Sequence, residues 1–184
     1  MKRALTWAGV AVAGLALFAC GPTRPDWIMK GSGAFKKDSK VFYGVGIAEG
    51  IHSESLRRQT ADNRAIAEIS KQLSVVSTNL MRDYMSNTSV PADQKANEEQ
   101  FIENTIKTFT SNVVSGVKII DRYQDKSGAL YSLASINLED LKTLAGEAKG
   151  LSAEVRQHIK ANAEKAFDKM SEEEAKSSGK SPLP

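Results

Sequence analysis

Cysteine and histidine, which often act as nucleophiles, bases and metal ligands, are rare in this sequence. The 184 residues include one cysteine, Cys20, and two histidines, His52 and His158. A single cysteine cannot form a disulfide within the chain, and it excludes a multi-cysteine zinc or iron–sulfur site. Neither histidine lies in a motif for metal binding or for an activated nucleophile. We therefore expect no catalytic residue, no bound cofactor and no metal site.

Cys20 stands at the end of an apolar leader that begins with two basic residues. Residues 4–19 carry no charge, and this run is shorter than the roughly 20 residues that a spanning helix needs. The pattern predicts a signal peptide over residues 1–19, with an uncleaved signal anchor as the alternative. Its end, Leu17-Phe18-Ala19-Cys20, resembles the lipobox of bacterial lipoproteins. The resemblance implies diacylglycerol on the Cys20 thiol, cleavage before Cys20 and acylation of the new amine, which together anchor a chain stably to a membrane.

The residue after the lipid cysteine predicts the membrane to which the lipoprotein is sorted. It is Gly21, whereas an aspartate there tends to retain lipoproteins in the inner membrane of Gram-negative bacteria. We therefore expect the outer membrane, facing either the periplasm or the cell surface. Cleavage removes two of the 25 basic residues, which leaves 23 against 22 acidic residues. Because these charges are mixed along the chain, we expect no nucleic-acid partner.

The mature chain begins with a Pro- and Gly-containing segment, residues 20–26, which predicts a lipidated tether. Residues 41–48 then alternate as a strand, with Phe42, Gly44, Gly46 and Ala48 on one face. Small residues on that face would allow a helix to approach closely. A dinucleotide-binding loop is not expected, because position 49, where the fingerprint needs a small residue, is glutamate.

Hydrophobic spacing predicts the remaining elements of an α+β domain over residues 27–148. A helix should begin after Ser53, with Asp62 and Glu68 on its solvated face. Around residue 73 the pattern becomes richer in β-branched residues, which favours a strand over 74–86, although a continued helix is the alternative. The other predicted elements are a helix over 92–113, a hairpin of strands 117–124 and 129–136, and a short helix over 138–148.

The C-terminal region contains a predicted amphipathic helix, residues 149–171, capped by Ser152. Its apolar stripe has two interpretations: packing on the parent domain, or docking on a partner or a membrane. Residues 172–184 are polar and low in complexity, which predicts a disordered tail. The stripe comprises Leu151, Val155, Ile159, Ala163, Phe167 and Met170.

The mature domain resembles the Lpp-twenty family of small bacterial envelope lipoproteins. The likeness is carried by four segments: 25–27 (Pro-Asp-Trp), 43–48, the helix at 61–73 running into 75–77, and 131–138. The resemblance implies an α+β fold, a small curved antiparallel sheet with a long helix packed across it, to which this chain adds a C-terminal helical extension. It implies no enzyme activity, and it relates the domain to the N-terminal domain of flagellar protein T. The family's recurring theme is association with the outer membrane or the flagellar apparatus.

These observations favour a noncatalytic, lipid-anchored envelope protein that binds another protein or forms a homo-oligomer. The alternative is a lipoprotein that binds a small ligand or peptidoglycan. A pocket on the sheet could be lined by Tyr43, Tyr84, Tyr123 or Tyr131, although aromatic residues on strands more often belong to the core.

Overall fold

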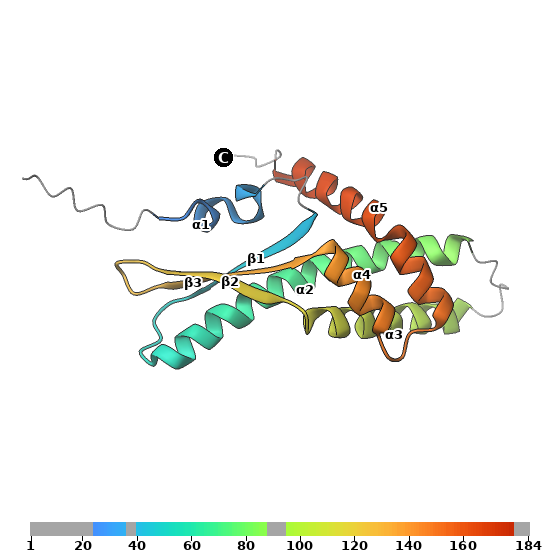
Figure 1. Ribbon diagram of the computed structural model, residues 1–184, viewed down its shortest axis with the longest axis horizontal. Coiled ribbons are helices and arrows are strands. Elements are labelled where there is room, and N and C mark those ends of the chain that lie inside the picture. Colours follow the sequence, from blue (N-terminus) through green and yellow to red (C-terminus); the bar gives the residue numbers. More distant parts are fainter. Residues whose placement is uncertain (1–23, 36–39, 88–94, 179–184) are drawn as a thin grey trace, which may run out of the picture.

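The computed structural model describes residues 24–35, 40–87 and 95–178, which form an α+β fold (Figure 1). Its first half contains α1 (Asp26–Lys30), a 3-10 turn (Gly31–Ala34), β1 (Val41–Ala48) and α2 (Glu54–Asn87). Its second half contains α3 (Lys95–Val114), β2 (Lys118–Gln124), β3 (Leu130–Asn137), α4 (Leu138–Glu147) and α5 (Ala153–Ser178). The predicted fold class is confirmed: an antiparallel sheet is crossed by a long helix and followed by a C-terminal helical extension.

The sheet has the strand order β1-β3-β2, and both neighbouring pairs are antiparallel. β2 and β3 form the predicted hairpin, whose turn is closed by a 3.1 Å hydrogen bond from the Gly128 amide to the Asp125 carbonyl. Gly128 has a φ of 86°, which a residue without a side chain adopts readily. The Asp125 carboxylate also accepts hydrogen bonds from the Ser127 and Ala129 amides, at 2.9 and 3.0 Å. The local sequence therefore closes this turn by itself.

α2 crosses the sheet where β1 has glycine. Phe42 and Ala48 are buried on this face, as the alternation predicts. A Cβ added to Gly46 would overlap the Ala61 carbonyl oxygen and the Ala65 nitrogen, so the helix backbone lies directly against the strand. The two glycines of β1 therefore decide how closely the long helix packs on the sheet.

The predicted strand over residues 74–86 is wrong, because α2 continues without a break from Glu54 to Asn87. Val76 and Leu80 are buried at helical spacing in the common core, whereas Val75 is 46% exposed. The hydroxyl of Ser74 donates to the Ser70 carbonyl at 2.9 Å, so it reinforces the helix instead of competing with its backbone. Core packing thus outweighs the local β preference of this segment.

α4 and α5 complete the core at the C-terminal end of the chain. The Asn137 side chain caps α4 by accepting a 2.6 Å hydrogen bond from the Asp140 amide. The Ser152 hydroxyl caps α5, as predicted, by accepting one from the Val155 amide at 3.3 Å. α5 extends to Ser178, so residues 172–178 are helical and not part of a disordered tail. The last six residues lie outside the described part of the chain.

The apolar stripe of α5 packs on its own domain, which settles the two interpretations left open by the sequence. Phe167 meets Phe42 of β1 edge to face, with ring centroids 4.8 Å apart. Val155 and Ile159 are each only 1% exposed. The stripe therefore belongs to the same hydrophobic core as the sheet and α2.

Candidate interaction site

Residues 24–35, here called the strap, cover the sheet face opposite α2 (Figure 1). Trp27 is buried, and its indole nitrogen donates a 3.0 Å hydrogen bond to the Asp121 carboxylate on β2. Phe35 stacks on Tyr43 of β1 with ring centroids 3.8 Å apart. These contacts tie the start of the domain to both edge strands of the sheet. The first helix of the folded domain begins at Asp26, which was predicted to be the last residue of the tether.

The predicted tyrosine pocket is not assembled from all four tyrosines. Tyr43, Tyr123 and Tyr131 share the sheet face beneath the strap, and the Tyr123 and Tyr131 rings are 6.4 Å apart. Tyr84 lies instead on α2, where it packs edge to face against His158 of α5. The guanidinium of Arg24 lies 5.7 Å from the centre of the Tyr131 ring, so the strap occupies this part of the face. The strap therefore packs against Tyr43 and Tyr131 of the sheet.

Asp62 of α2 forms a polar cluster with the hairpin. Its carboxylate accepts hydrogen bonds from Arg122 Nε at 2.9 Å, Arg122 Nη2 at 2.8 Å and the Ser132 hydroxyl at 2.7 Å. Burial raises the pKa of Asp62, but the hydrogen bonds from Arg122 and Ser132 and the nearby positive charges outweigh it, so the pKa lies below its ordinary value. The prediction that Asp62 is on a solvated face is therefore wrong. Its side chain is 19% exposed and joins α2 to β2 and β3.

The two histidines lie near opposite ends of α2. His52 precedes the helix, whereas His158 Nε2 lies 3.1 Å from the Leu80 carbonyl oxygen. The 27 residues from Ser53 to Leu80 correspond to about 40 Å of α-helix, so the two imidazoles do not share a site. The other ring nitrogen of His158 lies 3.2 Å from the Asn162 side-chain amide. His158 therefore lies in the contact between α2 and α5.

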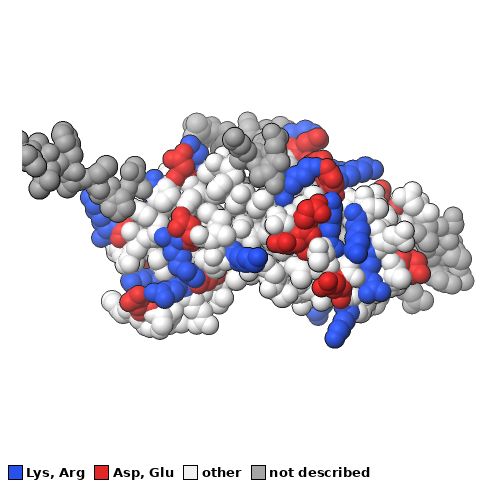
Figure 2. All heavy atoms as spheres, viewed as in Figure 1, with Lys and Arg blue, Asp and Glu red and all other residues white. Residues whose placement is uncertain are grey.

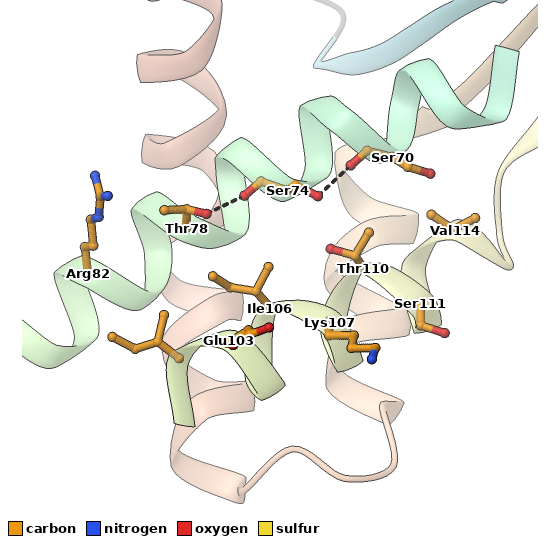
Figure 3. A pocket seen from close by; sticks show the side chains of 11 residues that line it. Ser70, Ser74, Thr78, Arg82, Glu103, Ile106, Lys107, Thr110, Ser111 and Val114 are labelled. Atoms are coloured by element: carbon orange, nitrogen blue, oxygen red, sulfur yellow. Dashed lines mark hydrogen bonds between the residues drawn. The ribbon is translucent and has the colours of Figure 1, made fainter. Parts of the chain in front are cut away.

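α3 returns alongside α2 (Figure 1). An open groove lies between these two helices (Figure 3). Its volume is about 1000 Å³. The α2 wall carries small hydroxyl residues and Arg82, and the α3 wall carries aliphatic residues together with charged and hydroxyl ones (Figure 3). The groove was not predicted from the sequence, although the four-residue spacing of the hydroxyl side chains at positions 70, 74 and 78 was visible there. The hydroxyl residues on α2 are Ser70, Ser74 and Thr78, the aliphatic residues on α3 are Ile102, Ile106 and Val114, and the charged and hydroxyl residues on α3 are Glu103, Lys107, Thr110 and Ser111.

Charged side chains of both signs are intermingled over the face in view (Figure 2). The described residues include several ion pairs, among them Lys40 with Glu164 and Lys142 with Glu139, the latter at 2.8 Å. Residues 24–35, 40–87 and 95–178 contain no group of three or more potential metal ligands. Among the same residues, no helix combines the length and apolar character required to cross a bilayer. Cys20 and the predicted lipobox, Leu17-Phe18-Ala19-Cys20, lie outside the described residues.

Comparison with known protein families identifies the family of this chain. The sequence matches the profile of the LPP20 lipoprotein family over residues 25–137. The match covers more than half of the chain, from the strap to the end of β3, and the chain belongs to this family. It is therefore a member of a lipoprotein family, as the resemblance to the Lpp-twenty family predicted. No curated protein matches the chain in a sequence search. α4 and α5 follow the matched segment, although they share its hydrophobic core.

Proposed function

We propose that this protein is a noncatalytic, lipid-anchored envelope lipoprotein that serves as a protein-interaction or oligomerisation module at the outer membrane. Diacylglycerol on Cys20 and an acyl group on its amine form the anchor in this proposal. Membership of a lipoprotein family supports the anchor, and the leader ending in Cys20 supplies its chemistry. Gly21 supports sorting to the outer membrane.

The tether limits how far the domain can move from the membrane. Six residues separate Cys20 from Trp27, and an extended chain of that length spans about 20 Å. Trp27 is fixed on the sheet by its burial and by its bond to Asp121. The folded domain would therefore stay close to the lipid surface, where it meets other envelope components at high local concentration.

The groove between α2 and α3 is the observation that carries the interaction role. Ile102, Ile106 and Val114 are only partly buried by their own domain, and they line one wall of an open concave surface. A groove between two helices that exposes aliphatic side chains in this way offers a surface on which a helix of a partner protein could dock. A role in catalysis finds less support, because the histidines are far apart and the Asp62 carboxylate is engaged by Arg122 and Ser132.

Two experiments test the proposal. Labelled palmitate should be incorporated into the wild-type chain and not into Cys20→Ser, which should move to the soluble periplasmic fraction. A photoreactive amino acid at Ser74, within the groove, should crosslink a protein in cells, whereas the same group at the exposed Lys126 of the hairpin turn serves as the control. Absence of lipid from the wild type contradicts the anchor, and absence of groove-specific crosslinks contradicts the interaction role. Capture of sacculi without any protein crosslink would instead support the peptidoglycan-binding alternative.

A further inference from the structure

The α2 wall of the groove is shaped for close contact with another helix. Ser70, Ser74 and Thr78 follow one another at four-residue intervals, so a ridge of small side chains runs along the helix (Figure 3). Their hydroxyls donate to the carbonyls of Ile66, Ser70 and Ser74, at 3.0, 2.9 and 2.7 Å. Because these donors already have partners, covering this wall leaves none of the three hydroxyl protons unpaired. Small residues at such spacing let two helix backbones approach closely.

The α3 wall supplies apolar surface and a buried hydroxyl without a partner among the described residues. Ile102, Ile106 and Val114 are partly exposed along it. The hydroxyl of Thr110 is buried and has no hydrogen-bond partner among the described residues. A buried hydroxyl without a partner costs free energy, so an occupant of the groove that bonds to it would be favoured.

The charges on α3 indicate what that occupant is. Glu103 and Lys107 both line the groove and are exposed, and neither has an ion-pair partner in the described part of the chain. They flank position 105, next to the midpoint of α3, which runs from Lys95 to Val114. When a helix pairs antiparallel with its own copy about this point, Glu103 of each copy faces Lys107 of the other. The same register places Gln100 of the second copy level with Thr110, whose hydroxyl needs a partner.

We infer that the occupant of the groove is α3 of a second copy of this chain. Each α3 lies between α2 and α3 of the other copy, around a two-fold axis, and the four helices form a bundle. Because the register is centred on residue 105, the two α3 helices overlap over residues 96–114, or about 28 Å of α-helix. The inference rests on the proposed role as an oligomerisation module, and it names the surface and the partner. Such a contact uses the same patch on both copies, as two-fold dimers require.

Charge reversal tests this pairing. We would purify the full lipidated chain in detergent and measure its mass by analytical ultracentrifugation with the detergent contribution matched out. The wild type should be a dimer. Glu103→Lys or Lys107→Glu alone places like charges opposite each other twice in the dimer and should weaken dimerisation at least about tenfold. The double variant E103K/K107E restores opposite charges and should recover the dimer. Lys126→Glu, at the exposed hairpin turn, is the matched control and should leave the dimer unchanged.

Each other outcome overturns the pairing. These outcomes are a monomeric wild type, single variants that dimerise as well as the wild type, or a double variant that stays monomeric while its circular dichroism spectrum is native. The proposed function is judged separately by the crosslinks from Ser74. Crosslinks to a different protein, together with a monomeric wild type, would retain the interaction role and reject self-pairing. Absence of any crosslink together with a monomeric wild type would reject both.

Discussion

Asp62 and Arg122 form a two-point ion pair although 60 residues separate them in the chain. Arg122 Nε and Nη2 donate to the two carboxylate oxygens of Asp62 at 2.9 and 2.8 Å. The pair connects the N-terminal half of α2 to the edge strand β2, and Ser132 of β3 adds a third hydrogen bond. Planar, two-point pairing of this kind is among the stronger polar contacts in proteins.

This relationship predicts a pH-dependent contribution to stability. The folded-state pKa of Asp62 is lowered, so its contribution is present above the ordinary value of 3.8 and is lost as the pH falls through the folded-state pKa. Asp62→Asn should lower the free energy of unfolding by about 1 kcal/mol at pH 7, a figure reduced because Arg122 is 41% exposed. The difference from wild type should shrink below about pH 4 in urea unfolding followed by circular dichroism. Glu68→Gln, in the exposed pair with Lys71, is the control and should change stability by less than about 0.5 kcal/mol.

Gly46 should be intolerant of any side chain. Glycine to alanine in a strand normally stabilises a protein by about 0.4–1 kcal/mol through the unfolded state. Here the new Cβ would overlap the backbone of Ala61 and Ala65, which cannot move without displacing α2. Gly46→Ala should therefore destabilise the fold by about 2–3 kcal/mol, measured by thermal unfolding. Gly33→Ala meets no atom within 4 Å and should behave almost like wild type; equal stability of the two variants would contradict close helix–sheet packing.

Trp27 should control whether the strap stays on the sheet. Trp27→Ala removes a buried indole and its hydrogen bond to Asp121. It should lower the free energy of local unfolding of the strap by about 3 kcal/mol. We expect faster amide hydrogen exchange in residues 24–35, measured by mass spectrometry, while α2 remains protected. Trp27→Phe keeps most of the apolar area and should have an intermediate effect. Met29 is 73% exposed, so Met29→Ala is the control; unchanged exchange in Trp27→Ala would show that the strap is held by other contacts.

Phe167 should stabilise the domain and have little direct effect on membrane binding. Its ring meets Phe42 at 4.8 Å, so Phe167→Ala removes a packed aromatic pair and should lower the free energy of unfolding by about 3 kcal/mol. Lys169→Ala, on the exposed side of α5, should have an effect below about 0.5 kcal/mol. Loss of vesicle binding in Phe167→Ala without a change in stability would instead indicate that α5 lies on the membrane.

Patterns that depend on neighbouring residues predicted much of the fold. The alternation in β1, the hairpin with its turn at residues 125–128, and the caps at Ser53 and Ser152 agree with the structure. These features depend on side chains a few residues apart, so the sequence contains their physical cause. The strand predicted at residues 74–86 was wrong because Val75 and Val76 have a local β preference, whereas burial of Val76 and Leu80 in the core favours the helix. The helical spacing of Leu73, Val76 and Leu80 was the available signal.

The sequence by itself determined the place of Cys20 after an uncharged N-terminal run, and it correctly predicted the α+β class and the family. Only the tertiary structure decided that the strap covers the tyrosines of the sheet, that Asp62 pairs with Arg122, that the stripe of α5 is internal and that a groove opens between α2 and α3. Each of these depends on which distant segments pack together. The free energy of that packing is spread over many contacts between residues remote in the chain, and no local pattern contains it.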